Sequence, residues 1–135
     1  MNNSIDYTPS RDSELLAKEA VKLLLEKLGR DVRLYDVRNG DAITDFYIVC
    51  TGRSITHVAA LADELDERMR TLGWNSERIE GKRGNSWILV DYLDVIVNIF
   101  DKESREFYNF DRLMSNESLV DISDLISEID AKFEH

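Results

Sequence analysis

The 135-residue sequence has one cysteine, one proline, six glycines and two histidines. A lone cysteine excludes an intramolecular disulfide, and so few Cys and His side chains exclude a Cys/His zinc site. Low Pro and Gly content excludes collagen-like and low-complexity chains. No apolar run approaches the ~18 residues that span a bilayer, and the first residues lack the basic and apolar stretches of a signal peptide. We therefore expect a cytoplasmic protein without membrane contact, metal or cofactor.

Cationic residues are also scarce, because 17 Lys and Arg stand against 27 Asp and Glu, a formal net charge of −10. This balance opposes unaided binding to a phosphate backbone and argues against DNA binding, but it suits a basic protein partner. Apolar residues make up 43% of the chain. That share, with this length, predicts one folded domain with a real core.

Hydrophobic periodicity and turn residues predict helices over about 12–28, 54–72, 102–109 and 117–133, and strands over about 32–38, 45–51, 75–80, 87–91 and 95–100. The long helices end at Gly29 and Gly73, where we expect left-handed backbone. The apolar run 45–51 predicts a strand inside the sheet, and the short last connections predict antiparallel hairpins. The fold class is α/β, with one mixed sheet of about five strands packed with helices and a C-terminal helical tail.

Composition divides the chain into three parts. Residues 1–12 are polar, contain Pro9 and are expected to form a flexible lead-in. The α/β domain covers 13–115. An acidic amphipathic helical tail covers 116–135, and from Asp111 onward seven acidic residues stand against Arg112 and Lys132.

Nucleophilic catalysis finds little support. Cys50 lies in an apolar strand and is expected to be a buried structural thiol. His57 lies in the first turn of the second long helix, where we expect a surface residue. No Ser-His-Asp arrangement is legible in the sequence.

An enzyme of nucleotide chemistry is the alternative from another class. Gly52 and Ser54 lie between a strand and a helix N-terminus, where free N–H groups can bind an anion. Asp91 and Asp94 would hold magnesium, but they are three residues apart, whereas carboxylates at i and i+2 of one strand share a face. The competing interpretation is a tight turn that needs Gly52 for its backbone and Ser54 as a helix cap.

The segment 79–94 concentrates a Trp, a Tyr, two cations and acids around two hairpin turns. Trp, Tyr and Arg are enriched in interface hot spots. Alternation predicts that Ile88 and Val90 face inward, and that Trp87, Leu89 and Asp91 share an outer face. Packing of Trp87 under a helix and exposure of Trp87 to a partner are equally compatible with this pattern.

Several stretches together resemble the ribosomal silencing factor family, RsfS, also called Iojap-like. They run in the family's order over about residues 13–115, and the block D-F-Y-I-V-C-T-G-R-S followed by E-G and W-I-L-V-D is the most specific part. The matching stretches are 31–38, 44–54, 57–58, 62–63, 80–81, 87–92, 94–97 and 105–108.

The resemblance implies a nucleotidyltransferase-like fold without catalytic carboxylates, and therefore no enzyme. It implies binding to ribosomal protein L-fourteen on the large ribosomal subunit, which blocks joining of the small subunit and represses translation. Organellar relatives assist assembly of the large subunit. The implied contact residues are Glu80, Arg83, Trp87, Leu89, Asp91, Tyr92 and Asp94. A homodimer of the free protein, formed through the same face, is a further expectation, and a purely self-associating module is the remaining alternative.

The sequence departs from the family pattern at two positions and at its end. Asn98 stands where relatives often carry His, and Met114 stands where a Trp is common. Residues 116–135 extend past the usual family end. This tail is expected to fold back on the body, to pair with another subunit, or to become ordered only on the ribosome.

Overall fold

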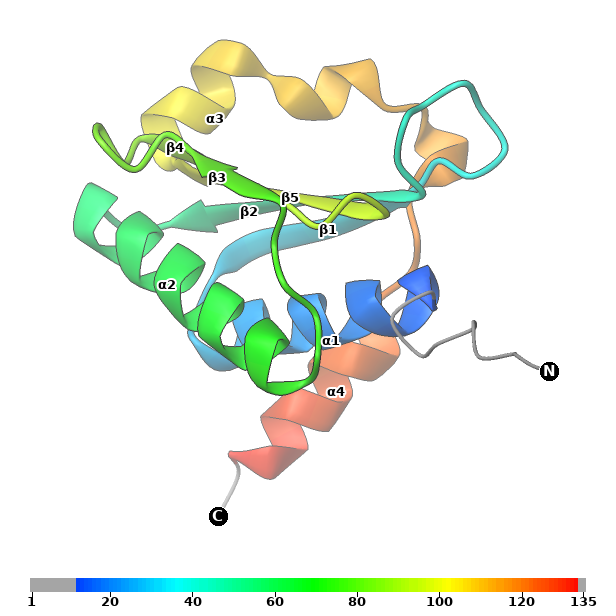
Figure 1. Cartoon of the computed structure of the whole chain (residues 1–135), viewed down its shortest axis with the longest axis horizontal. Helices are drawn as coiled ribbons and strands as arrows, with labels where there is room; N and C mark the ends of the chain where they lie inside the picture. Colours follow the sequence, from blue (N-terminus) through cyan, green and yellow to red (C-terminus); the bar gives the residue numbers. More distant parts are fainter. Residues whose placement is uncertain (1–11, 134–135) are drawn as a thin grey trace, which may run out of the picture.

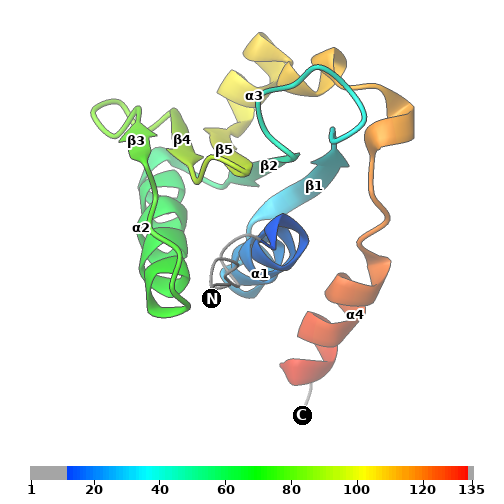
Figure 2. The same ribbon diagram turned by 45° about the vertical axis from the view of Figure 1, so that its right-hand side comes forward.

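The computed structural model describes residues 12–133. The chain forms one sheet with helices on both faces (Figure 1). Helices α1 and α2 cover one face, α4 packs on α1, and α3 with two 3-10 turns lies over the other face (Figure 2). The elements are α1 Ser13–Glu26, β1 Arg30–Asp36, β2 Phe46–Gly52, α2 Ile55–Thr71, β3 Arg78–Glu80, β4 Trp87–Asp91, β5 Val95–Asp101, α3 Lys102–Tyr108, the 3-10 turns Phe110–Leu113 and Asn116–Ser118, and α4 Ser123–Lys132.

The strand order is β1-β2-β5-β4-β3, in which β2 and β5 are parallel and the other neighbours are antiparallel. The expected α/β fold with a mixed five-stranded sheet is confirmed, as are the two hairpins. Strand β2 lies inside the sheet because its residues are apolar on both faces. Residue pairs run from Phe46 beside Val95 to Gly52 beside Asp101, so the carboxyl ends of the two parallel strands meet at one edge.

Two apolar cores lie on opposite sides of the sheet. The larger one fills the space between the sheet and the helices α1 and α2, whose inward faces are fully buried. The smaller one, on the outer face, consists of Tyr35, Val49 and Phe100 with half-buried neighbours that include Trp87 and Met114. Met114 therefore contributes to the outer core.

The end of α1 differs from the expectation. Leu28, with φ of 68°, adopts the left-handed conformation, and Gly29 does not. Gly29 is needed for another reason, because a Cβ there would lie 2.5 Å from Cys50 Sγ. At the end of α2 the expectation is confirmed, since Gly73 has φ of 102°.

The C-terminal segment begins as an extended chain rather than a helix. We expected a helix from residue 117, but α4 starts at Ser123. Before α4, the Val120 N–H donates to the Leu34 carbonyl oxygen at 2.8 Å, and Leu119 forms an isolated antiparallel β-bridge with Tyr35. This pairing satisfies backbone groups at the free edge of β1 while apolar side chains pack on the core.

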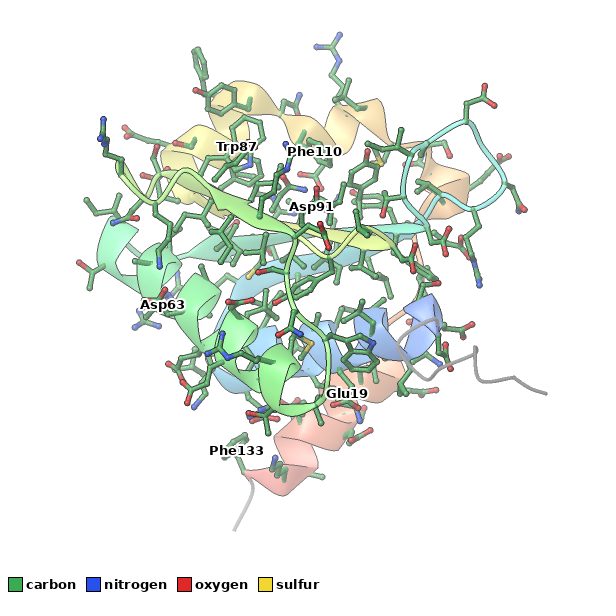
Figure 3. The ribbon with its side chains drawn as sticks, viewed as in Figure 1. Glu19, Asp63, Trp87, Asp91, Phe110 and Phe133 are labelled. Atoms are coloured by element: carbon green, nitrogen blue, oxygen red, sulfur yellow. The ribbon has the colours of Figure 1, made fainter. Side chains whose placement is uncertain are left out.

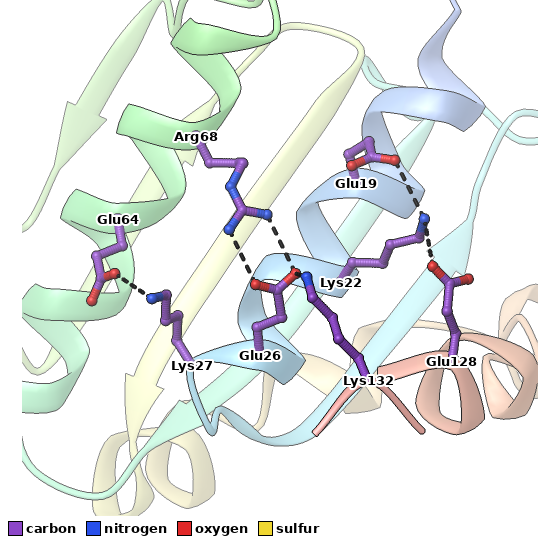
Figure 4. A network of polar contacts seen from close by, with 8 residues as sticks. All are labelled: Glu19, Lys22, Glu26, Lys27, Glu64, Arg68, Glu128 and Lys132. Carbon is purple, nitrogen blue, oxygen red and sulfur yellow. Dashed lines mark hydrogen bonds and ion pairs between the residues drawn. The ribbon is translucent and has the colours of Figure 1, made fainter. Parts of the chain in front are cut away.

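Ion pairs join α4 to the helical layer (Figure 4). Lys22 Nζ lies 3.0 Å from Glu128, and Lys132 Nζ lies 3.4 Å from Glu26, which also accepts from Arg68. Of the three expected arrangements of the tail, the structure shows folding back on α1. The expected lead-in, Asp12 excepted, lies outside the described residues; the Asp12 side chain caps α1.

Candidate functional site

The outer face of β4 carries the side chains that the sequence assigned to it. Ile88 and Val90 point into the larger core, and Trp87, Leu89 and Asp91 alternate with them on the other side. Figure 3 shows Trp87 and Phe110 on the side of the sheet that carries α3. Leu89 is half-buried and belongs to neither core. The β3–β4 part of this face is therefore open.

Trp87 is held from three directions. Its ring centroid lies 4.9 Å from that of Phe100 and 4.8 Å from that of Tyr108. Its Nε1–H donates to Asn98 Oδ1 at 3.1 Å. Asn98 is buried, and a His ring nitrogen at its position could accept this hydrogen bond equally. Both interpretations of Trp87 are partly met, because it packs against Tyr108 of α3 and is only half-buried.

Helix α3 presents aromatic side chains to solvent. None of its seven residues, all of them described, is fully buried. Phe107 is 81% exposed and Tyr108 52% exposed. The Asp101 side chain caps its first turn, and Asn109, with φ of 50°, ends it. We call the surface formed by Phe107, Tyr108, Trp87, Leu89 and Glu80 the docking surface.

The other predicted site residues have mixed positions. Asp91 is buried and accepts hydrogen bonds from Arg78 Nε at 3.2 Å and from Leu93 N–H at 2.8 Å. Tyr92 lies on the opposite face of the sheet, where its hydroxyl donates to Asp66 at 3.0 Å. Burial raises the pKa of this phenol, so Tyr92 is a neutral buried donor.

The remaining predicted residues are Glu80, Arg83 and Asp94. Glu80 is exposed and pairs with Arg78 at 3.0 Å, and Arg83 is exposed in the β3–β4 turn. Asp94 is half-buried, and its carbonyl oxygen accepts from the Asp45 and Phe46 N–H groups, which fixes the start of β2. The structure thus brings Glu80, Trp87, Leu89 and Asp91 to one face and Tyr92 to the other.

The residues of the nucleotide-enzyme alternative are not brought together. Gly52 is beside Asp101 at the carboxyl end of β2, whereas Asp94 precedes Val95 at the opposite end. Six residue steps of roughly 3.3 Å put about 20 Å between the two ends. Within residues 12–133, no group of three or more His, Cys, Asp or Glu side chains is arranged to hold a metal ion. Nor is any helix of this described part sufficiently long and apolar to cross a membrane.

Sequence reasoning missed the role of Arg105. Its Nε and Nη2 donate to Asp111 at 3.1 and 3.2 Å, and its Nη1 donates to the Asp31 carbonyl oxygen and to Thr51 Oγ1. Although burial raises the pKa of Asp111, hydrogen bonds from Arg105 and Tyr35 outweigh this effect and hold it below its usual value. Arg105 lies within a stretch that matches the family, which was the one available signal.

His57 is also more than a surface residue. The backbone N–H of Arg53 donates to His57 Nδ1 at 3.0 Å, so Nε2 carries the proton and donates to the Lys27 carbonyl oxygen at 2.9 Å. The ring therefore joins the start of α2 to the end of α1. Cys50 is fully buried as expected, and burial raises the pKa of its thiol to about 12.

The fold is a small mixed α/β domain with one open aromatic face and no assembled catalytic site among the described residues. Comparison with protein families matches residues 10–135 to the family described as ribosomal silencing factor during starvation, RsfS. The chain belongs to this family, which is one of non-enzymatic regulators of the ribosome. The catalytic alternative is thereby set aside.

Relatives and a solved structure agree with this assignment. The chain is 38% identical over 97 residues to ribosomal silencing factor RsfS of Haemophilus influenzae, covering 69% of this chain and 95% of that one. It is 31% identical over 112 residues to the RsfS of Halalkalibacterium halodurans, covering 83% and 96%. A crystal structure of a Chromobacterium violaceum protein superposes with a TM-score of 0.74 at 27% identity, covering 76% and 86%. The match through residue 135 includes α4 in the family region.

Proposed function

We propose that this protein binds ribosomal protein L-fourteen on the large ribosomal subunit through the docking surface, and thereby blocks joining of the small subunit in the cytoplasm. The observation that carries the proposal is the cluster around Trp87, whose indole is fixed by Phe100, Tyr108 and Asn98 beside the exposed ring of Phe107. Fixed aromatic side chains lose little entropy on binding and are typical hot spots.

Charge supports the choice of partner. The net charge of −10 and the exposed acid Glu80 on the docking surface complement a basic ribosomal protein. Steric exclusion of the small subunit needs affinity and position, and it needs no reacting group. This agrees with the family's non-enzymatic class.

The test compares two phenylalanines that are both exposed. Phe107 lies on α3 and is 81% exposed, whereas Phe133 follows α4 on the far side of the molecule and is 59% exposed (Figure 3). Binding to purified large subunits is measured by co-sedimentation, and subunit joining is measured on sucrose gradients. Phe107→Ala should weaken binding about thirtyfold, which corresponds to about 2 kcal/mol, and should restore joining. Phe133→Ala should behave as wild type.

Trp87→Ala extends the test to the half-buried anchor. We expect a loss of at least about 2 kcal/mol in binding, with thermal unfolding measured in parallel because Asn98 loses its donor. Equal binding of wild type, Phe107→Ala and Trp87→Ala would refute the docking surface. Failure of the wild type to enter the large-subunit fraction would refute the proposed function itself.

We also propose that the free protein forms a homodimer through the docking surface. Exposed Phe107 and Tyr108 beside half-buried Leu89 are the observation that favours it. Sedimentation equilibrium of wild type should show a dimer that Phe107→Ala converts to monomer. A wild type that stays monomeric at high concentration contradicts this pairing, and a dimer that is unaffected by Phe107→Ala assigns it to another face.

A further inference from the structure

A basic pocket lies at the carboxyl ends of the parallel strands. It has a volume of about 520 Å³ and is formed by the start of β1, the end of β2, the residue after β2, and α3 with the turn that follows it. In open α/β sheets, ligands bind in the crevice outside the carboxyl ends of the strands. Five cationic residues line it, namely Arg30, Arg33, Arg53, Lys102 and Arg105.

The charge of this pocket is opposite to that of the whole chain. The five cations stand against three acids, Asp31, Glu106 and Asp111, whereas the whole sequence has 17 cations and 27 acids. Arg105 and the Tyr35 hydroxyl already satisfy Asp111. Two acids therefore remain against four cations.

The other four cations lack a carboxylate partner in the described part of the chain. Among residues 12–133, Arg30, Arg33, Arg53 and Lys102 form no ion pair with a carboxylate, although most other Lys and Arg side chains of that part do. All four residues are exposed. Cations that line one pocket without a carboxylate partner repel one another, and a bound anion reduces that repulsion.

Arg105 fixes the floor of the pocket. Its guanidinium side chain is only 11% exposed and bridges β1, β2 and the turn after α3. This part of the pocket is therefore set before any ligand arrives, which lowers the entropic cost of binding. Guanidinium groups that converge on a pre-formed hollow suit the tetrahedral oxygens of phosphate.

The pocket adjoins the docking surface across α3. Tyr108 on one side of this helix contacts Trp87, while Lys102 and Arg105 on the other side line the pocket. A partner that covers the docking surface therefore places its neighbouring groups over the pocket. On a ribosomal subunit, the phosphate-bearing neighbour of a ribosomal protein is RNA.

We propose that this pocket binds a phosphate group, and that in the subunit-bound protein this group is a backbone phosphodiester of ribosomal RNA. The RNA source rests on the proposed function, whereas the phosphate chemistry does not. Because the rest of the chain is acidic, the pocket limits RNA contact to one place and one orientation.

The first test uses the free protein labelled with ¹⁵N. Oligouridylate RNA of six nucleotides and, separately, GDP are titrated at low salt while backbone amide shifts are followed. The RNA should move the amides of Thr51, Gly52, Arg53 and Lys102. Arg30→Gln/Arg53→Gln should weaken this binding about tenfold or more, and Arg38→Gln/Arg70→Gln, which removes the same charge from ion-paired sites elsewhere, should not.

Each other outcome is decisive. If neither RNA nor GDP shifts the amide signals, the phosphate pocket is refuted. If both double variants lose the same RNA affinity, binding depends only on net charge, and the pocket is refuted as a specific site. Binding of GDP at least tenfold tighter than that of RNA keeps the phosphate site but overturns the RNA source.

The second test uses purified large subunits over a range of salt concentrations. Arg30→Gln/Arg53→Gln should lower the slope of log affinity against log salt by about 1 for each cation removed. Phe107→Ala should lower affinity without changing that slope. An unchanged slope in the double variant refutes the RNA contact. If wild type does not bind subunits at all, the proposed function fails, and the titration of the free protein still decides the phosphate pocket.

Discussion

Replacing Arg105 with methionine tests what attaches the outer layer to the sheet. Helix α3 buries none of its own residues fully, so apolar packing alone holds it weakly. Arg105 donates four hydrogen bonds from α3 to Asp111, Thr51 and the Asp31 carbonyl oxygen. Methionine keeps an unbranched apolar stem, although a shorter one, and removes every donor.

The expected cost follows from burial. The side chains of Arg105 and Asp111 are 11% and 18% exposed, so water replaces little of the lost interaction. Removing one partner of such a pair leaves a desolvated charge and typically costs 3–5 kcal/mol, and we expect about 3 kcal/mol here because Tyr35 still donates to Asp111. For a chain of this size the unfolding temperature should fall by about 10 °C.

Urea unfolding of Arg105→Met, Asp111→Asn and the double variant measures the coupling between the two residues. We expect a coupling energy of about 2 kcal/mol or more, because the second change costs little once the first partner is gone. Arg112→Met is the control, since Arg112 is exposed on the same segment. A cost below about 1 kcal/mol for Arg105→Met, or additive single changes, would refute Arg105 as the anchor of the outer layer.

Three further changes test other parts of the fold. Gly81→Ala should lower the free energy of unfolding in urea by about 3 kcal/mol or more, because φ is +92° and a Cβ would overlap the Trp87 carbonyl oxygen. Gly84→Ala is the control, since a Cβ there meets open space, and it should cost under about 1 kcal/mol. Glu26→Gln should cost about 1–2 kcal/mol of stability near neutral pH, because hydrogen bonds from Arg68 hold the pKa of Glu26 below its usual value. This contribution is complete above the unfolded pKa of about 4.3 and is lost as pH falls through the lower folded pKa. The difference in unfolding free energy between wild type and variant should therefore close at low pH, and a difference that persists contradicts the assignment. His57→Ala should lower stability by about 1–2 kcal/mol in thermal unfolding, and an unchanged midpoint would contradict the bridge between α1 and α2.

Local sequence signals predicted most of the architecture. The apolar run 45–51 placed an interior strand, and the short connections after β3 and β4 forced antiparallel hairpins. The alternation in β4 predicted which side chains face the core. These features depend on the periodicity of a few neighbouring residues, which a sequence displays directly.

The features that failed depend on distant partners. Leu119 and Val120 fit a helical pattern, but the open edge of β1 offers backbone partners, and the extended form results. Gly29 looked like a left-handed helix end, whereas its lack of Cβ makes room for Cys50. Asp91 and Tyr92 lie on opposite faces of the sheet because adjacent positions of a strand point to opposite sides, and their role as contact residues stays a prediction.

The short helix α3 links the two proposed contacts with the ribosome. Tyr108 supports Trp87 on one side, and Lys102 and Arg105 line the basic pocket on the other. A shift of α3 would therefore move the aromatic contact with protein and the cationic contact with RNA together. Because Arg105 fixes α3 to β1 and β2, its loss should weaken subunit binding more than the removal of any single unpaired cation of the pocket. Comparing the subunit affinity of Arg105→Met with that of Arg30→Gln measures this link, and equal affinities would show that the two contacts are independent of α3.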